Sequence, residues 1–151
     1  MRKVWKPSVT VAAVIERGGR FLLVEEIAEG RHVLNQPAGH LDPGESLAVA
    51  CAREALEETA HEFVPSALVG IYRWHHAAAD VTFLRFAFAG HLKSFDAARS
   101  LDKEIVAVHW LTPAEIAARR DEHRSPLVSR CVEDFLSGRR YPLELFSSQF
   151  S

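Results

Sequence analysis

The sequence predicts an α/β fold in which helices cover a mixed β-sheet. Several short runs rich in β-branched and aromatic residues are separated by turn residues, which is typical of strands. One Ala-, Leu- and Glu-rich segment interrupts these runs and is predicted to be a helix, and two further helix starts follow the last run. Strands and helices in this mixture pack in layers around one core. With 151 residues, we expect a single domain spanning residues 1–151.

The predicted strands are residues 9–15, 20–25, 32–34, 68–75, 81–90 and 105–111. The first two flank Gly18-Gly19, a hairpin signal, so we expect them to pair and open the fold. Pro65 is expected to break the chain before the later strands begin.

The central predicted helix covers residues 47–58, which contain no Gly or Pro. A second helix is predicted to begin at 112–115, where Thr, Pro, Ala and Glu form a capping signal. A third is predicted to begin at Ser125-Pro126 and to end at Gly138.

Three carboxylates of the central helix are predicted to share one face. Glu54, Glu57 and Glu58 stand at i, i+3 and i+4. Two such charges roughly 5 Å apart repel by about 3 kcal/mol at an effective dielectric near 20, and only Arg53 lies beside them. A solvated surface helix is one interpretation. A hard cation such as Mg²⁺, which takes carboxylate oxygens and substrate phosphates, is the other.

The opposite side of this helix carries Val49, Ala52 and Leu56, which we expect to pack on the core. Gly39 and Gly44 precede the helix. Without side chains there, backbone carbonyls and amides can approach an ion or a phosphate.

The stretch from Gly39 to His61, GHLDPGESLAVACAREALEETAH, resembles the Nudix box. The residues at the required spacing are Gly39, Glu45, Arg53, Glu54, Glu57 and Glu58. Ala60 replaces the usual Gly, and alanine is poorly suited to a left-handed helix end. His61 replaces an aliphatic residue. The resemblance implies the α/β/α sandwich of the Nudix hydrolases, with a mixed sheet.

Stretches outside the box are similar to the NudJ-type phosphatases: LNQPAGHL at 34–41, TFLRF at 82–86, RSPLV at 124–128 and GRRYPLE at 138–144. This resemblance implies hydrolysis of phosphoanhydrides in nucleoside tri- and diphosphates and in hydroxymethylpyrimidine diphosphate, a thiamin precursor. It also implies that orthophosphate is released; the alternative is another Nudix pyrophosphohydrolase, which would cleave nucleoside triphosphates to a monophosphate and pyrophosphate.

The resemblance further implies roles for individual residues. Mg²⁺, with Mn²⁺ as the alternative ion, would be held by Glu54, Glu57 and Glu58 and a backbone carbonyl near Ala38 or Gly39. Glu54 and Glu58 are expected to be the main ligands. The general base is left open between these two and Glu104, and Arg53 is expected to orient a box glutamate.

Candidate substrate-binding residues lie outside the helix. Arg85, in the apolar run VTFLRFAF, is predicted to contact a phosphate in a cleft or else to face outward into solvent. Trp74, Phe83 and Phe86 are candidates either for stacking on a base or for the core. Asn35, Gln36 and His40 border the glycine turn, where they would contact the substrate or stabilise the turn.

Composition limits the function classes. With 18 basic and 20 acidic residues the net charge is −2, which argues against a nucleic-acid partner. No run of about 18 apolar residues predicts a membrane span, and no signal peptide is recognised, so a cytoplasmic protein is expected. Cys51 and Cys131 are expected to be buried free thiols, with a disulfide as the alternative.

The expected partner is a small phosphorylated metabolite, and the expected state is a monomer or homodimer. Two further hypotheses are a Nudix module that senses a nucleotide without cleaving it and a hydrolase of RNA ends. The first is disfavoured because every box glutamate is present, and the second because no basic stripe is present.

Overall fold

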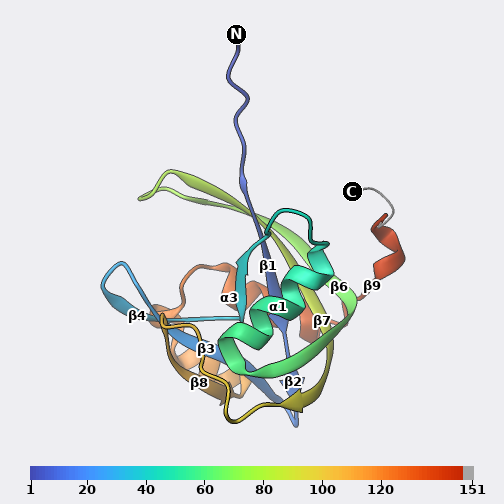
Figure 1. Ribbon diagram of the computed structural model, residues 1–151. Coiled ribbons are helices and arrows are strands. Elements are labelled where there is room, and N and C mark those ends of the chain that lie inside the picture. Colours follow the sequence, from blue (N-terminus) through green and yellow to red (C-terminus); the bar gives the residue numbers. More distant parts are fainter. Residues whose placement is uncertain (148–151) are drawn as a thin grey trace.

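The computed structural model describes residues 1–147, in which helices lie on both faces of a mixed β-sheet (Figure 1). The strands are β1 (Ser8–Val14), β2 (Glu16–Arg17), β3 (Arg20–Ala28), β4 (Arg31–Asn35), β5 (Ala38–His40), β6 (His61–His76), β7 (Val81–Phe95), β8 (Ile105–Leu111) and β9 (Tyr141–Pro142). The helices are α1 (Leu47–Thr59), α2 (Pro113–Ala118) and α3 (Leu127–Leu136), with 3-10 turns at Arg120–Glu122 and Leu143–Leu145. The predicted α/β class is confirmed.

The strands form two sheets. The first has the order β5-β1-β7-β6-β9, and it is mixed because β1 runs parallel to β7 while its other pairs are antiparallel. The second is antiparallel and contains β2, β3 and β4, with β8 also paired to β3. Helix α1 lies in front of the first sheet and α3 lies behind it (Figure 1).

The predicted pairing of residues 9–15 with residues 20–25 in an opening hairpin is wrong. β1 pairs with β5 and, from Ser8↔Phe83 to Val14↔Ala89, with β7. Gly18-Gly19, with φ of 60° and 79°, instead joins the two-residue β2 to β3. The reason is burial. Residues 11–14 are at most 1% exposed, and a strand buried on both faces belongs in the centre of a sheet.

The predicted break at Pro65 is also wrong, because β6 runs through it without interruption. Pro65 pairs with Gly90, and the register shifts between Pro65 and Ala67. Proline is tolerated at such an irregularity because its missing N–H interrupts the ladder there in any case. A Cβ at Gly90 would overlap the Val64 carbonyl, so this close approach of the two strands requires glycine.

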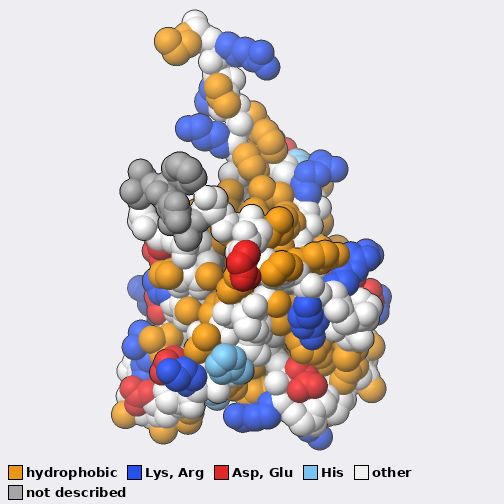
Figure 2. Space-filling model, turned by 90° about the vertical axis from the view of Figure 1, so that its right-hand side faces the viewer, with side chains coloured by type: hydrophobic (Ala, Val, Ile, Leu, Met, Phe, Trp, Pro, Cys, Tyr) orange, Lys and Arg blue, Asp and Glu red, His pale blue; other side chains and the backbone are white. Residues whose placement is uncertain are grey.

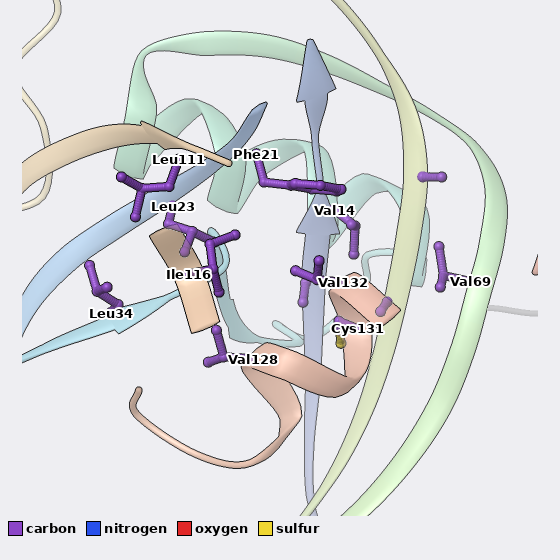
Figure 3. Packing of buried hydrophobic residues seen from close by; sticks show 13 residues of the cluster. Val14, Phe21, Leu23, Leu34, Val69, Leu111, Ile116, Val128, Cys131 and Val132 are labelled. Atoms are coloured by element: carbon purple, nitrogen blue, oxygen red, sulfur yellow. The ribbon is translucent and has the colours of Figure 1, made fainter. Parts of the chain in front are cut away.

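Two hydrophobic clusters hold the layers together. One lies between the two sheets and the helices α2 and α3, where Val14, Phe21, Ile116, Val128 and Val132 meet (Figure 3). The other lies under α1 and contains Ala50, Cys51 and Ala55 together with residues of β1, β6 and β7. Both cysteines are buried free thiols, as predicted.

The predicted apolar face of α1 is wrong. Val49 is 57% exposed and Ala52 and Leu56 are only half-buried, whereas the small residues Ala50, Cys51 and Ala55 contact the sheet. Small side chains allow a close approach of the helix, and the helix is rotated so that part of its acidic side also turns inward. Glu58 is consequently only 7% exposed.

The ends of α2 and α3 follow the predicted signals, and α1 begins at a serine cap that was not predicted. Ser46 caps α1 by accepting a bond from the Val49 amide, and Thr112 and Glu115 form the predicted capping box of α2. α3 begins after Ser125-Pro126, and Gly138 follows its end with φ of 88°. Ala60 takes the left-handed conformation (φ 60°, ψ 15°) despite its Cβ, and its amide donates to the Leu56 carbonyl.

Residues 1–7 precede β1 and extend away from the body of the molecule (Figures 1 and 2). Val4 and Trp5 are 70% and 67% exposed on this segment. Within the part of the chain that the structure describes, no helix has the length and apolar character needed to span a membrane.

Candidate active site

A cleft of about 610 Å³ opens over the first sheet beside the edge strand β5. Strand register builds its floor: Arg85 of β7 lies opposite Thr10 of β1 and Tyr72 of β6, and Phe83 lies opposite Trp74. The predicted site residues that line the cleft are Asn35, Ala38, Gly39, His40, Glu54, Glu58, Trp74, Phe83, Arg85 and Glu104. The structure therefore brings most of the predicted residues into one cleft.

Three carboxylates meet beside this cleft, and two of them, Glu54 and Glu58, line it. Oxygens of Glu54, Glu58 and Asp102 lie within 4.8 Å of one another, and this is the only such metal-ligand group in residues 1–147. Asp102 is not among the residues predicted from the sequence, which named Glu104, two positions later, only as a candidate base. The amide of Asp102 donates to the Glu57 carbonyl at 3.0 Å, which brings the loop before β8 against the end of α1.

The Glu58 carboxylate is the most enclosed of the three. Its Oε1 accepts the Ala38 amide of β5 at 2.9 Å. Burial, with the nearby charges of Glu26, Glu54 and Asp102, raises the pKa of Glu58 to about 9 despite this bond. Burial likewise raises the pKa of Glu54 and of Asp102.

This donor set fits a divalent cation. Its ligands are hard carboxylate oxygens, which suit Mg²⁺ and Mn²⁺, and within residues 1–147 Glu58 and Asp102 have no cationic side chain within 4.0 Å. A bound cation would supply the missing positive charge.

Gly39 lets Glu54 reach the cluster. Helix α1 carries Glu54 past the edge strand β5, and the carboxylate lies against the Cα of Gly39. A Cβ at this position would overlap the Glu54 carboxyl group. The glycine is thus required by close packing, because its φ is not in the left-handed region.

Arg53 holds the surrounding carboxylates in place. Its Nε and Nη2 donate to both oxygens of Glu45 at 2.9 and 2.6 Å, and its Nη1 donates to Glu54 and Glu57 at 2.8 and 2.7 Å. The guanidinium lowers the pKa of Glu45. Glu57, predicted as a metal ligand, is therefore paired with Arg53 and lies outside the three-carboxylate group.

Arg85 lies in the cleft and is only 6% exposed, so the alternative of a solvated, outward-facing side chain is excluded. Its Nη1 donates to Gln36 Oε1 at 2.9 Å, and its Nη2 donates to Asn35 Oδ1 at 3.0 Å. Gln36 is 1% exposed, does not line the cleft, and donates its Nε2 to the Val128 carbonyl at 2.9 Å. Gln36 is thus placed behind the cleft wall.

An aromatic surface continues the floor away from the carboxylates. Trp74 stacks on Phe83 with ring centroids 5.7 Å apart and on His76 at 5.0 Å, and all three side chains line the cleft. Phe86, the third candidate for stacking, instead packs against the cluster under α1 and lies 6.1 Å from the ring of Phe146.

The NUDIX domain family model matches residues 5–131. The chain belongs to the Nudix family. It is 41% identical over 143 residues to "Phosphatase NudJ" of Escherichia coli K12, covering 94% of this chain and 92% of that protein, and equally to that of Shigella boydii. A Nudix hydrolase structure from Nitrosomonas europaea is 54% identical, with a TM-score of 0.92 over 94% of this chain and 97% of that one.

More distant structures share the Nudix fold alone. A MutT protein from Methanosarcina mazei is 22% identical, with a TM-score of 0.71 over 91% of this chain and 99% of that one. The recognised family, the fold and the assignment as a Nudix hydrolase are therefore confirmed.

The Nudix box of this hydrolase separates into two groups of acids. Glu54 and Glu58 meet Asp102, while Glu45 and Glu57 pair with Arg53, and Glu54 belongs to both groups because Arg53 Nη1 also donates to it at 2.8 Å. Glu104 lines the same cleft from an exposed position two residues after Asp102. This division follows from where β5 and the loop before β8 meet the helix.

Proposed function

We propose that this Nudix hydrolase cleaves phosphoanhydride bonds in nucleoside tri- and diphosphates and in hydroxymethylpyrimidine diphosphate, and that it releases orthophosphate. The observation that carries the proposal is a cleft lined by Glu54, Glu58 and the buried Arg85, with Asp102 completing a group of three carboxylates around Glu54 and Glu58. Relatives named NudJ phosphatase, alike over 94% of the chain, support the choice of substrates and product.

The cofactor in this proposal is Mg²⁺, with Mn²⁺ as the alternative. Glu54, Glu58 and Asp102 would hold it, together with a backbone carbonyl near Ala38 or Gly39. Such a cation neutralises charge on a diphosphate and lowers the pKa of a bound water. The contribution of the chain is to fix three ligands in a small space before any ion arrives, with Gly39 and the Ala38 amide holding Glu54 and Glu58.

The general base is proposed among the acids that face the cleft. Glu58 and Glu54 lie in the carboxylate group and Glu104 lies at its exposed side, within the same cleft. A base must reach the proton of the attacking water, directly or through one water. Arg53 pairs with Glu54 and does not line the cleft, which supports an orienting role.

The base of the substrate is proposed to stack on Trp74 and Phe83. Their rings are nearly parallel, at 16°, and line the cleft beside Arg85. Aromatic stacking does not depend on which base is present, so this surface suits a range of nucleotides and a small pyrimidine alike. We expect the protein to act in the cytoplasm as a monomer or homodimer.

The test is hydrolysis of nucleoside triphosphates, diphosphates and hydroxymethylpyrimidine diphosphate in Mg²⁺, with orthophosphate and pyrophosphate measured separately. Orthophosphate from the diphosphates is the expected product. Glu58→Gln is expected to lower kcat by about a hundredfold or more, because it removes a ligand or base. Glu133→Gln, on the exposed side of α3, is the matched control and should keep wild-type activity.

Other results would point elsewhere. Pyrophosphate and monophosphate from triphosphates alone would keep the Nudix chemistry and overturn the proposed product. Binding without turnover of any substrate in the panel would indicate a nucleotide-sensing module instead.

A further inference from the structure

The strongest unexplained feature is the charge of Arg85. Among residues 1–147 it is the only buried arginine, with 6% exposure. No carboxylate oxygen of these residues lies within 4.0 Å of its guanidinium nitrogens. Its oxygen partners are the neutral side-chain amides of Asn35 and Gln36, at 3.0 and 2.9 Å.

Several of the more exposed arginines are paired with acids. Arg124, on the wall of the same cleft, is 48% exposed and contacts Glu26 at 2.6 Å, and Arg53 is surrounded by four carboxylates. An unpaired charge destabilises the folded protein far more when it is buried than when it is exposed to solvent. The buried arginine, for which a missing counter-charge costs most, therefore has no carboxylate partner among residues 1–147.

We propose that Asn35 and Gln36 are positioning residues that hold Arg85 without neutralising its charge. A phosphoryl group of the substrate then supplies the counter-charge. The ligand class is a tetrahedral oxyanion bound in the cleft floor, separate from the carboxylate group of Glu54, Glu58 and Asp102. The proposal deepens the proposed function and rests on it for the identity of the anion.

The geometry of the two amides supports this assignment. Each uses its oxygen to accept from a different Nη of Arg85, which fixes the plane of the guanidinium. Gln36 is fixed in turn, because its Nε2 donates to the Val128 carbonyl in the first turn of α3. A planar donor held in one orientation is suited to two oxygens of one phosphoryl group.

Strand register adds a second, independent argument. Phe83 and Arg85 are two residues apart on β7 and so lie on the same face. The stacking surface of Trp74 and Phe83 is therefore directly beside the guanidinium. A base on the aromatic rings would place its phosphates over Arg85 and toward the carboxylates.

The test compares Asn35→Asp with Asn35→Ala, using binding of inorganic phosphate to the metal-free protein by calorimetry and thermal melting as the two readouts. The aspartate keeps an acceptor for Arg85 and adds the missing counter-charge. We expect it to weaken phosphate binding by about tenfold or more, since a carboxylate beside the guanidinium repels the anion. The alanine variant should bind phosphate better than the aspartate variant.

Stability should follow the opposite order. Asn35→Asp is expected to melt at or above the wild-type temperature, because it compensates a buried charge, whereas Asn35→Ala should melt below it. A purely structural role for Asn35 predicts that the aspartate variant resembles the wild type in both readouts. Phosphate binding by Asn35→Asp equal to the wild type would therefore overturn the proposal.

Two more variants separate an effect through Arg85 from other effects. Gln36→Glu places a charge beside Arg85 at a side chain that does not line the cleft, so weaker phosphate binding there must act through the guanidinium. Ala79→Asp adds the same charge at the exposed rim and should leave phosphate binding near the wild-type value. Equal losses in all three charged variants would contradict the proposal, because they would reflect net charge alone.

Steady-state kinetics complete the test. In Mg²⁺ with a nucleoside diphosphate, Asn35→Asp should raise KM more than it lowers kcat, because ground-state binding of a phosphoryl group is lost. Since phosphate binding needs no turnover, it tests Arg85 even if no phosphoanhydride in the panel is cleaved. Failure of the proposed function and failure of this inference are thus distinguishable.

Discussion

At Gly39, the absence of one methyl group decides where the Glu54 carboxylate lies. The carboxyl group occupies the space that a Cβ would fill, and Glu54 is thereby brought to Glu58 and Asp102. Conformational freedom is not the reason for this glycine, because its φ lies outside the left-handed region. The residue determines a side-chain position rather than a turn.

Gly39→Ala is expected to weaken the binding of Mn²⁺ by about tenfold or more, because moving one of three carboxylates by its own width removes a ligand. Calorimetric titration of the metal-free protein with Mn²⁺ measures this. Gly30→Ala is the matched control: Gly30 has φ of 78° and open space around it, so its variant should lose stability without losing metal affinity. Unchanged Mn²⁺ affinity in Gly39→Ala would contradict this account of the glycine.

At the scale of the element, α1 and the turn before it behave as one unit because of Arg53. Its guanidinium connects Glu45 of the turn to Glu54 and Glu57 of the helix, and its Nη2 also donates to the His40 carbonyl of β5 at 3.0 Å. The ammonium group of a lysine cannot form the same set of charge-assisted hydrogen bonds as the planar guanidinium.

Arg53→Lys is expected to lower the free energy of unfolding by about 1–3 kcal/mol and to lower kcat, since a single ammonium satisfies only part of this set. Denaturant unfolding and steady-state assays check the two effects. Arg20→Lys is the control, because Arg20 and Glu115 form one pair with both side chains half exposed, and a change within about 0.5 kcal/mol is expected. Equal stability of the two lysine variants would refute this role of Arg53.

At the scale of the whole molecule, folding couples to the proton on Glu58. The pKa of Glu58 rises from its ordinary 4.5 to about 9 because the folded protein buries the carboxylate. The folded state therefore binds this proton more tightly than the unfolded chain does. Stability from this group is fully present below pH 4.5 and is lost as pH rises toward about 9.

In EDTA, the free energy of unfolding of the wild type is accordingly expected to fall between about pH 6 and about pH 9, by up to about 1.4 kcal/mol for each pH unit. The melting temperature should fall with it. Glu58→Gln cannot ionise and should show a flatter profile, which thermal melting across this range will measure. Adding Mn²⁺ should stabilise the wild type most at the alkaline end, because the cation binds the deprotonated carboxylate. Identical slopes for the two metal-free proteins would contradict the buried, proton-binding Glu58.

Sequence patterns predicted the local features of this protein. The i, i+3, i+4 spacing of Glu54, Glu57 and Glu58, the capping box at Thr112 and the turn at Gly18-Gly19 depend on neighbours within a few residues. The box spacing also identified the family, which the comparisons confirm. These features could be predicted because short-range geometry is the same in any fold.

The tertiary structure decided which parts meet. Only folding shows that β1 lies between β5 and β7, that Asp102 joins the box carboxylates in place of Glu57, and that Arg85 is buried between two amides. The direction in which α1 turns its small residues likewise depends on the sheet beneath it. Contacts between residues far apart in the sequence are set by packing of the whole core, and no local pattern in the chain encodes them.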